Sequence, residues 1–92
     1  MLSAMGDPVR QRILEMLSRG RRSAGTIART LDMKPPAVSH HLRKLREAGL
    51  IVGIRNGNEI LYRLNVTVIE EVSIYLGELA RSLQRTEGKR RQ

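Results

Sequence analysis

The chain has 92 residues, the size of one small domain, and its 17 Lys and Arg outnumber 9 Asp and Glu, giving a net charge of +8. It has no cysteine, which excludes disulfides, thiolate metal sites and cysteine nucleophiles, and no apolar run approaches the ~18 residues of a membrane span. We therefore expect no membrane insertion, and the lack of cysteine fits a cytoplasmic protein. A positive charge of this size favours binding to a polyanion, with solubility alone as the alternative. Because aromatic residues make up only 2 %, the stacking that holds single strands is scarce, which favours double-stranded DNA.

Two helices are predicted in the first third of the chain. Asp7-Pro8 is typical of a helix N-cap followed by proline in the first turn, and Gly20 closes the helix that begins there. Ser23 is suited to cap a second, shorter helix, which ends at the break Asp32-Met33. Apolar residues recur at helical spacing in both segments: Val9, Ile13, Leu14 and Leu17, then Ala24, Ile27, Ala28 and Leu31.

A third helix is predicted between the double proline and Gly49. Proline lacks an amide hydrogen and is tolerated only in the first turn, so this helix should begin between residues 34 and 36. Val38, Leu42 and Leu45 form its apolar stripe, which leaves polar and basic residues on the other faces.

A β-hairpin follows the third helix. Leu50–Ile54 and Ile60–Leu64 are rich in β-forming residues, and Asn56-Gly57 between them indicates a hairpin, because both positions of such a turn favour positive φ. The register stays open at this stage, since a two-residue and a four-residue loop both fit.

The chain ends in a long predicted helix that begins at about Val66. Its apolar residues recur at helical spacing: Val68, Val72, Tyr75, Leu76, Leu79 and Leu83. Two helices joined by a short turn, with a hairpin beside the second, describe a winged helix-turn-helix, a mainly α fold with a small β-hairpin. We expect a single domain over residues 1–85 and a basic, disordered tail over residues 86–92.

Three stretches resemble the ArsR/SmtB family of bacterial winged helix-turn-helix repressors. They are MGDPVRQRILEML, PAVSHHLRKLREAGLI and RNGNEILYRLN, which come in the family's order and span Met5–Asn65. The stretch LNVTVIEEVSIYLGELARSL is similar to the SdpR-type branch of this family, which consists of metal-independent autorepressors. The resemblance implies a cytoplasmic homodimer that represses transcription by binding an imperfect inverted repeat in its own operator.

The resemblance also implies that the first and last helices form the dimer interface. Because the first helix is short, most of the contact is expected from the last helix. The predicted interface is Leu2, Met5, Val68, Val72, Tyr75, Leu76 and Leu79. The alternative is that the apolar stripe of the last helix packs on its own domain.

The third helix is expected to lie in the major groove of DNA, where short polar groups can read base edges. The resemblance assigns base contacts to Ser39 and His40, and both side chains can donate or accept hydrogen bonds. Many family members carry Ser-Gln where this chain has Lys34-Pro35, so a bidentate contact to adenine is replaced there by apolar contact. Pro36 completes the predicted base-contacting set.

Phosphate contacts are expected along the same helix. Lys34 lies at its start, where free backbone N–H groups and the positive end of the helix dipole also favour phosphate. His41, Arg43 and Lys44 follow within the next turns. His41 lies about 100° further round the helix than His40, so packing beneath the helix is the alternative to a phosphate contact, and a solvated face is the alternative for Arg43 and Lys44.

The hairpin is expected to act as the wing. The predicted wing residues are Arg55, Asn56, Gly57 and Arg63, placed at the minor groove or at flanking phosphates. A plain surface hairpin is the alternative.

Neither metal binding nor catalysis is expected. The two histidines are neighbours, whereas a helical pair of metal ligands needs i,i+4 spacing, and Glu70 and Glu71 lack a histidine partner. Adjacent Ser39 and His40 cannot form a nucleophile–base hydrogen bond on a helix. We therefore expect no metal, no cofactor and no enzyme activity. A sequence-specific repressor is favoured over a non-specific architectural DNA binder or a protein-interaction module, and the sequence identifies no protein or small-molecule inducer.

Overall fold

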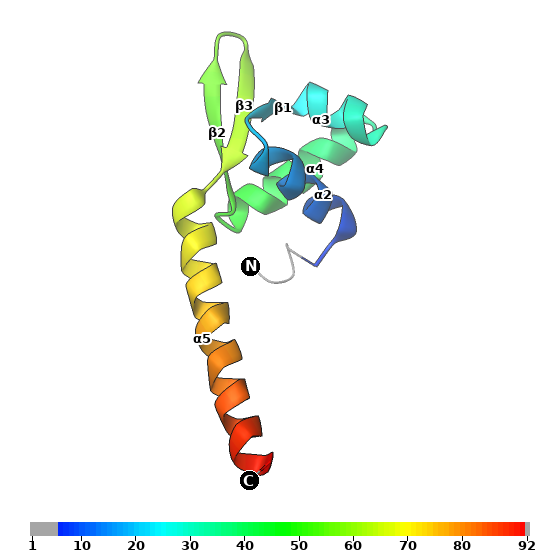
Figure 1. The fold of residues 1–92 in the computed structure, drawn as a ribbon. Helices are drawn as coiled ribbons and strands as arrows, with labels where there is room; N and C mark the ends of the chain where they lie inside the picture. Colours follow the sequence, from blue (N-terminus) through cyan, green and yellow to red (C-terminus); the bar gives the residue numbers. More distant parts are fainter. Residues whose placement is uncertain (1–5, 92) are drawn as a thin grey trace.

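The computed structural model describes the backbone of residues 6–91 and the side chains of residues 6–86. Helices α2 (Pro8–Ser18), α3 (Ala24–Leu31) and α4 (Pro35–Glu47) pack beside strands β1 (Arg22–Ser23), β2 (Ile51–Asn56) and β3 (Glu59–Leu64), and helix α5 (Val66–Arg91) follows. Figure 1 shows the β2–β3 hairpin at one end of the molecule and α5 projecting from the other. The predicted order of three helices, a hairpin and a long last helix is confirmed.

The predicted cap residues set the starts and ends of the first helices. The Asp7 carboxylate accepts hydrogen bonds from two amides of the first turn of α2, at 2.8 and 3.2 Å. The Ser23 hydroxyl accepts from one amide of the first turn of α3 at 3.2 Å. Asp32, with a φ of 52°, ends α3 in the left-handed conformation, so the turn between α3 and α4 is as tight as the sequence predicts.

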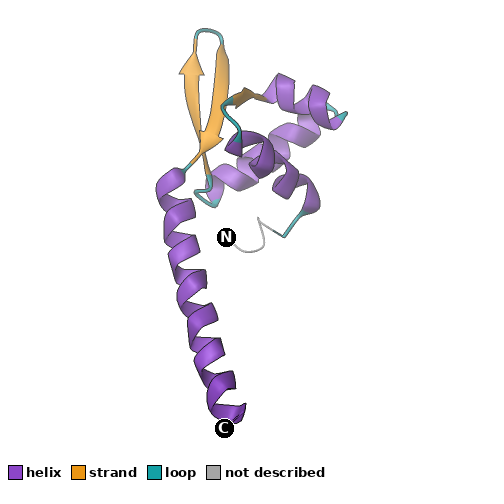
Figure 2. Cartoon of the chain, viewed as in Figure 1, coloured by secondary structure: helices purple, strands orange, loops and turns teal. Residues whose placement is uncertain are grey.

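The sheet has one more strand than predicted. Its order is β1-β3-β2, all antiparallel, because Arg22 and Ser23 pair with Tyr62 and Leu61 of β3. A two-residue strand is too short to show the alternation that identifies strands in a sequence, which is why the sequence does not reveal β1. Its pairing places the start of α3 directly beside the hairpin (Figure 2).

The hairpin has a two-residue loop, but not at the expected pair of residues. Asn56 pairs with Glu59, so Gly57 and Asn58 form the centre of the turn, and the four-residue loop is wrong. Gly57 has a φ of 65° while Asn58 has no positive φ, as in a turn that needs glycine only at its first central position. Asn56 is therefore the last paired residue of β2, and the expectation that it occupies a central turn position is wrong.

The core lies between the three helices and the base of the sheet. The predicted stripe of α4 is buried in it, as are the central residues of the stripes of α2 and α3, whereas Val9, Leu14, Ala24 and Leu31 are half-buried at its edge. Leu50, the start of β2 and one residue of β3 complete it. The buried residues are Ile13, Leu17, Ile27, Ala28, Val38, Leu42, Leu45, Leu50, Ile51 and Tyr62. Helix α5 contributes only partly buried side chains, Val68 and Ile69, from its first turns.

Helix α5 leaves this core at a defined junction. The Asn65 amide donates to the Leu50 carbonyl at 2.9 Å, and the Asn65 carbonyl accepts from the Ile69 amide at 3.1 Å. The backbone is helical from there to Arg91, and the principal extents of the molecule are 61 × 23 × 21 Å. The division into a domain of residues 1–85 and a disordered tail of residues 86–92 stays a prediction.

Candidate nucleic-acid interface

Helix α4 begins at the double proline as predicted, with Lys34 as its N-cap. Two prolines remove two amide donors, and the Ala37 and Val38 amides both bond to the Lys34 carbonyl, at 3.1 and 3.2 Å. The expectation of free backbone N–H groups for a phosphate at this helix start is therefore wrong. An anion there would meet the exposed Lys34 side chain and the positive end of the helix dipole.

The outward face of α4 presents a row of side chains opposite the core. Pro36, His40, Arg43 and Glu47 follow one another at helical spacing and are all exposed. Ser39 and Lys44 are exposed on the two flanks of this row, while Val38, Leu42 and Leu45 on the opposite side are buried. The structure thus gathers the predicted base-contacting residues and two of the predicted phosphate-contacting cations on one accessible surface.

Arg43 connects its neighbours along this row. Its Nη2 lies 3.2 Å from Nδ1 of His40, and its Nε lies 3.7 Å from the Glu47 carboxylate. Because a guanidinium can only donate, Nδ1 of His40 must accept, which leaves the proton of the neutral imidazole on Nε2. In this arrangement His40 offers a hydrogen-bond donor, not an acceptor, on its remaining nitrogen.

His41 is turned toward α2 and is half-buried. Arg10 of α2 donates from Nε to Nδ1 of His41 at 3.2 Å. The His41 ring also packs edge-on against the His40 ring, with centroids 5.8 Å apart. The hydrogen bond from the Arg10 amide is the largest cause that lowers the pKa of Asp7, and the hydrogen bond from the Val9 amide and the charge of Arg10 lower it further. His41 therefore packs against the start of α2, in agreement with the second of its two expected positions, although the sequence does not indicate Arg10 as its partner.

The predicted wing residues separate into two groups. Arg55, Asn56 and Gly57 are exposed near the tip of the hairpin. Arg63 instead pairs with Val52 farther from the tip, is half-buried, and donates from Nη1 to the Leu64 carbonyl at 3.0 Å. The structure does not bring Arg63 to the tip with the others.

The predicted dimer residues lie mostly along α5. Leu2 and Met5 fall outside the described residues. Val68 and Val72 are half-buried, whereas Tyr75, Leu76 and Leu79 are 60 %, 45 % and 48 % exposed. Leu83 continues this stripe and is also exposed. The start of the stripe therefore packs on its own domain and the remainder faces outward.

Among the residues that the structure describes, no group of three or more His, Cys, Asp or Glu side chains could hold a metal ion. Nor does this part of the chain contain a helix that is long and apolar enough to cross a membrane.

These features define a class of protein. A helix pair joined by a tight turn, a second helix with an exposed polar face and an adjacent hairpin make up a winged helix-turn-helix of the DNA-binding type. Residues 5–54 match the family model described as a helix-turn-helix domain.

Comparisons with known proteins identify the family more closely. Over 68 residues the chain is 41 % identical to the transcriptional repressor SdpR of Bacillus subtilis (strain 168), covering 74 % of this chain and 76 % of SdpR. The chain belongs to the ArsR/SmtB family of winged helix-turn-helix transcriptional repressors, as its sequence predicts. Its relatives are regulators of transcription, not enzymes. Some of the other curated relatives are matched over only 47 to 59 % of their own length.

Solved structures share the fold. An ArsR-like transcriptional regulator from Rhodococcus sp. RHA1 is similar over 99 % of this chain and 84 % of its own, with a TM-score of 0.88 and 27 % identity. The homodimeric winged helix-turn-helix domain Mb0332 from Mycobacterium bovis is similar over 89 % and 76 %, with a TM-score of 0.71 and 24 % identity.

Proposed function

We propose that this protein is a sequence-specific repressor that binds an inverted-repeat operator as a homodimer, represses its own gene and needs no metal. The observation that carries the proposal is the exposed row on α4, where short polar groups and cations lie together opposite the core. The major groove admits a helix of this kind, and each base pair presents a distinct pattern of donors and acceptors there.

Each residue of the proposed interface has a role that follows from its chemistry. Ser39 and the Nε2–H of His40 bond to base edges, and Pro36 contacts an apolar base group such as a thymine methyl. Phosphates are bound by Lys34 at the helix start, by Arg43 in the outward row, by Lys44 on its flank, and by His41 on the side toward α2. The wing adds Arg55, Asn56 and Gly57 near its tip, and Arg63 from a position closer to its base.

The proposed dimer rests on the outward part of the α5 stripe. A helix that projects from its domain with an exposed apolar stripe is typical of a surface that another chain covers. The structurally similar domain Mb0332 is a homodimer of the same fold. A two-fold dimer binds two half-sites related by the same symmetry, which is why the proposed operator is an inverted repeat.

Independence from metal is supported by the donor set. The sequence has no cysteine, and its two histidines are adjacent on α4, where Arg10 and Arg43 occupy their Nδ1 atoms. Autoregulation rests on the similarity to SdpR-type repressors and is tested by asking whether the protein binds upstream of its own gene.

The test begins with selection of bound genomic fragments by the purified protein, which gives the operator. The affinity of the double variant S39A/H40A is then compared with that of the wild type on operator and on random duplex. We expect operator binding to weaken by about 1–3 kcal/mol for each good base contact that the variant loses, and random binding to change little. Equal weakening on both duplexes would identify a non-specific architectural binder instead.

A further inference from the structure

Three side chains of α4 are proposed to meet base edges, and two of them cannot distinguish a hydrogen-bond donor on the DNA from an acceptor. The Ser39 hydroxyl carries one donor and two acceptor lone pairs and rotates to suit its partner, so it fits either kind of edge. Pro36 has no polar side-chain atom. The direction of the hydrogen bond that a base must make therefore depends on His40, which is exposed in the outward row.

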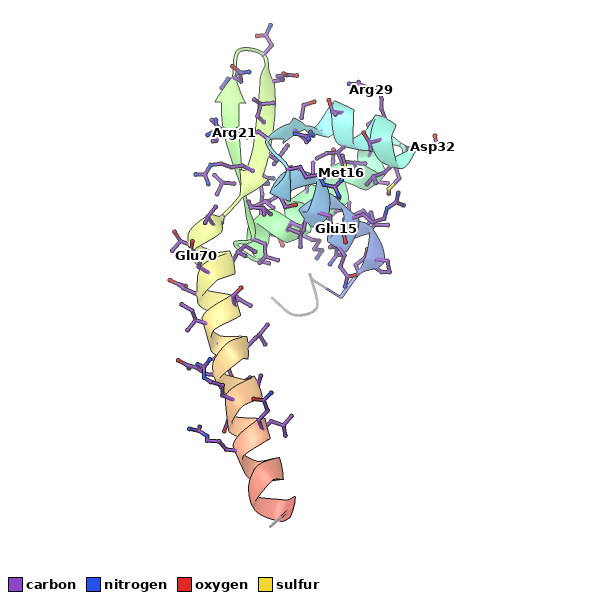
Figure 3. All side chains as sticks on the ribbon, in the orientation of Figure 1. Glu15, Met16, Arg21, Arg29, Asp32 and Glu70 are labelled. Carbon is purple, nitrogen blue, oxygen red and sulfur yellow. The ribbon has the colours of Figure 1, made fainter. Side chains whose placement is uncertain are left out.

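These residues follow the tight turn between α3 and α4. Figure 3 shows Asp32, which ends α3 at this turn, on the side of the molecule away from Glu70 near the start of α5. Pro36, Ser39 and His40 are all exposed on the first two turns of α4. A bulky partner such as a duplex can therefore reach them.

Arg43 determines which nitrogen of the His40 ring carries the proton. Its Nη2 lies 3.2 Å from Nδ1 of His40, and a guanidinium has five N–H donors and no acceptor. If the proton moved to Nδ1, two donors would face each other at this distance and the hydrogen bond would be lost. The edge-on contact with the His41 ring also restrains the orientation of the His40 ring. The neutral His40 side chain therefore presents an N–H group at Nε2.

Arg43 can hold His40 and bind DNA at the same time. Its Nη2 contacts His40 and its Nε lies 3.7 Å from the Glu47 carboxylate, whereas Nη1 takes part in neither contact. The donors of a guanidinium lie in one rigid plane, so a phosphate can bind at Nη1 without releasing His40. The restraint on the His40 ring is thus compatible with the phosphate contact proposed for Arg43.

We propose that Arg43 is a positioning residue that makes His40 a hydrogen-bond donor only, so that His40 selects guanine in each half-site and rejects cytosine. In the major groove guanine presents two acceptors, N7 and O6, whereas cytosine presents an amino donor. The Nε2–H group can bond to guanine, but opposite cytosine two donors would meet, and Arg43 disfavours the tautomer that could accept. This inference rests on the DNA binding proposed above and adds the base that one residue of the interface selects.

The tautomer is tested on the free protein, without DNA. Long-range proton–nitrogen NMR spectra at about pH 8, where an imidazole is neutral, distinguish protonated from unprotonated ring nitrogens, and the signals missing from H40Q identify His40. We expect the wild type to carry the His40 proton on Nε2 and R43M, which has no donor at this position, to show a mixture of both tautomers. R43K keeps a donor and should resemble the wild type. A mixture in the wild type, or no change in R43M, would refute the role of Arg43 whether or not the protein is a repressor.

The base preference is tested on the selected operator. The position that His40 reads is the one at which H40A loses the preference among bases, and the wild type should bind guanine there about five- to tenfold more tightly than cytosine. R43M should bind both duplexes more weakly and lose most of this ratio, whereas R43K should retain it. The matched control K44M removes one cation from the same helix but leaves the contact of Arg43 with His40 in place, so it should weaken binding and keep the ratio.

The outcomes separate this inference from the proposed function. A preference for another base at this position, an H40A variant that changes the preference at no position, or an equal loss of the ratio in R43M and K44M would refute the inference and leave sequence-specific repression in place. A wild-type protein that selected no operator would refute the proposed function and the base selection that rests on it. The NMR spectra would still decide whether Arg43 fixes the tautomer.

Discussion

Arg43 holds two neighbours at once, and one of them is an anion on the surface proposed to face DNA. Its Nε lies 3.7 Å from Glu47, and both side chains are more than half exposed. An exposed pair of this kind contributes little to stability, roughly 0–1 kcal/mol, so its main effect is on the charge that the helix presents. Glu47 reduces the positive charge of the outward face at the C-terminal end of α4.

We expect E47Q to bind duplex DNA more tightly than the wild type, by about two- to fivefold at moderate salt, because one anion is removed and Arg43 is released. Fluorescence anisotropy with a labelled duplex measures this change. The control E78Q removes the same charge from α5, far from α4, and should have no comparable effect. Weaker binding by E47Q would instead mean that Glu47 orients Arg43 for its phosphate.

At the scale of single elements, the cap of α2 makes its stability depend on pH. Hydrogen bonds from the Arg10 and Val9 amides and the nearby charge of Arg10 lower the pKa of Asp7 below its ordinary value of 3.8. Because the pKa is lower in the folded protein, the carboxylate stabilises the fold above that ordinary value and loses this effect as the pH falls through the lowered pKa.

We therefore expect D7N, which keeps an acceptor but not the charge, to melt at a lower temperature than the wild type at pH 7. The difference should shrink as the pH falls below about 4 and disappear in stronger acid. Thermal melts followed by circular dichroism between pH 7 and pH 2 measure it, with D7A as the variant that lacks the cap at every pH. A difference between wild type and D7N that did not change with pH would contradict this account.

The helices are predictable because their boundaries depend on local chemistry. Asp7, Ser23 and the double proline act within one turn, so the sequence alone places the starts of α2, α3 and α4. Strand β1 and the turn position are not predictable, since β1 exists only through its pairing with Tyr62 and Leu61. The hairpin register likewise depends on how both strands meet the core.

In the candidate site, too, features set by local sequence are predictable and features set by tertiary contacts are not. The outward position of His40 and Arg43 follows from the apolar stripe of α4, which any helical projection of the sequence shows. The hydrogen bond of His41 with Arg10 joins residues 31 positions apart, and the pairing of β1 with β3 joins segments about 40 residues apart along the chain. Such contacts are set by tertiary packing, and no local pattern records them.

For the whole molecule, the exposed part of α5 decides whether the protein is a dimer. Successive residues of a helix are about 100° apart, which places Leu76 and Leu79 on one side and Ile74, itself 63 % exposed, nearly opposite. Apolar side chains are therefore exposed on two opposite faces of α5, and only the face with Leu76 and Leu79 belongs to the proposed dimer contact.

We expect the double variant L76E/L79E to be monomeric at micromolar concentration, because two carboxylates cannot be buried in an apolar contact without a partner. The control I74E places the same kind of charge on the opposite side and should remain dimeric. Sedimentation or size-exclusion chromatography with light scattering separates the two cases. If I74E dissociated and L76E/L79E did not, the proposed contact face would be wrong.

The junction at Asn65 has a consequence for the spacing of the two operator half-sites that the proposed dimer can bind. The hydrogen bond from the Asn65 amide to the Leu50 carbonyl connects the start of α5 to the segment that follows α4. In the proposed dimer, the angle between α5 and the domain that carries α4 determines the distance between the two α4 helices. That distance in turn determines which number of base pairs between the half-sites is bound best. Substitutions at this junction should change the preferred spacer length of the operator without changing the recognition of each half-site.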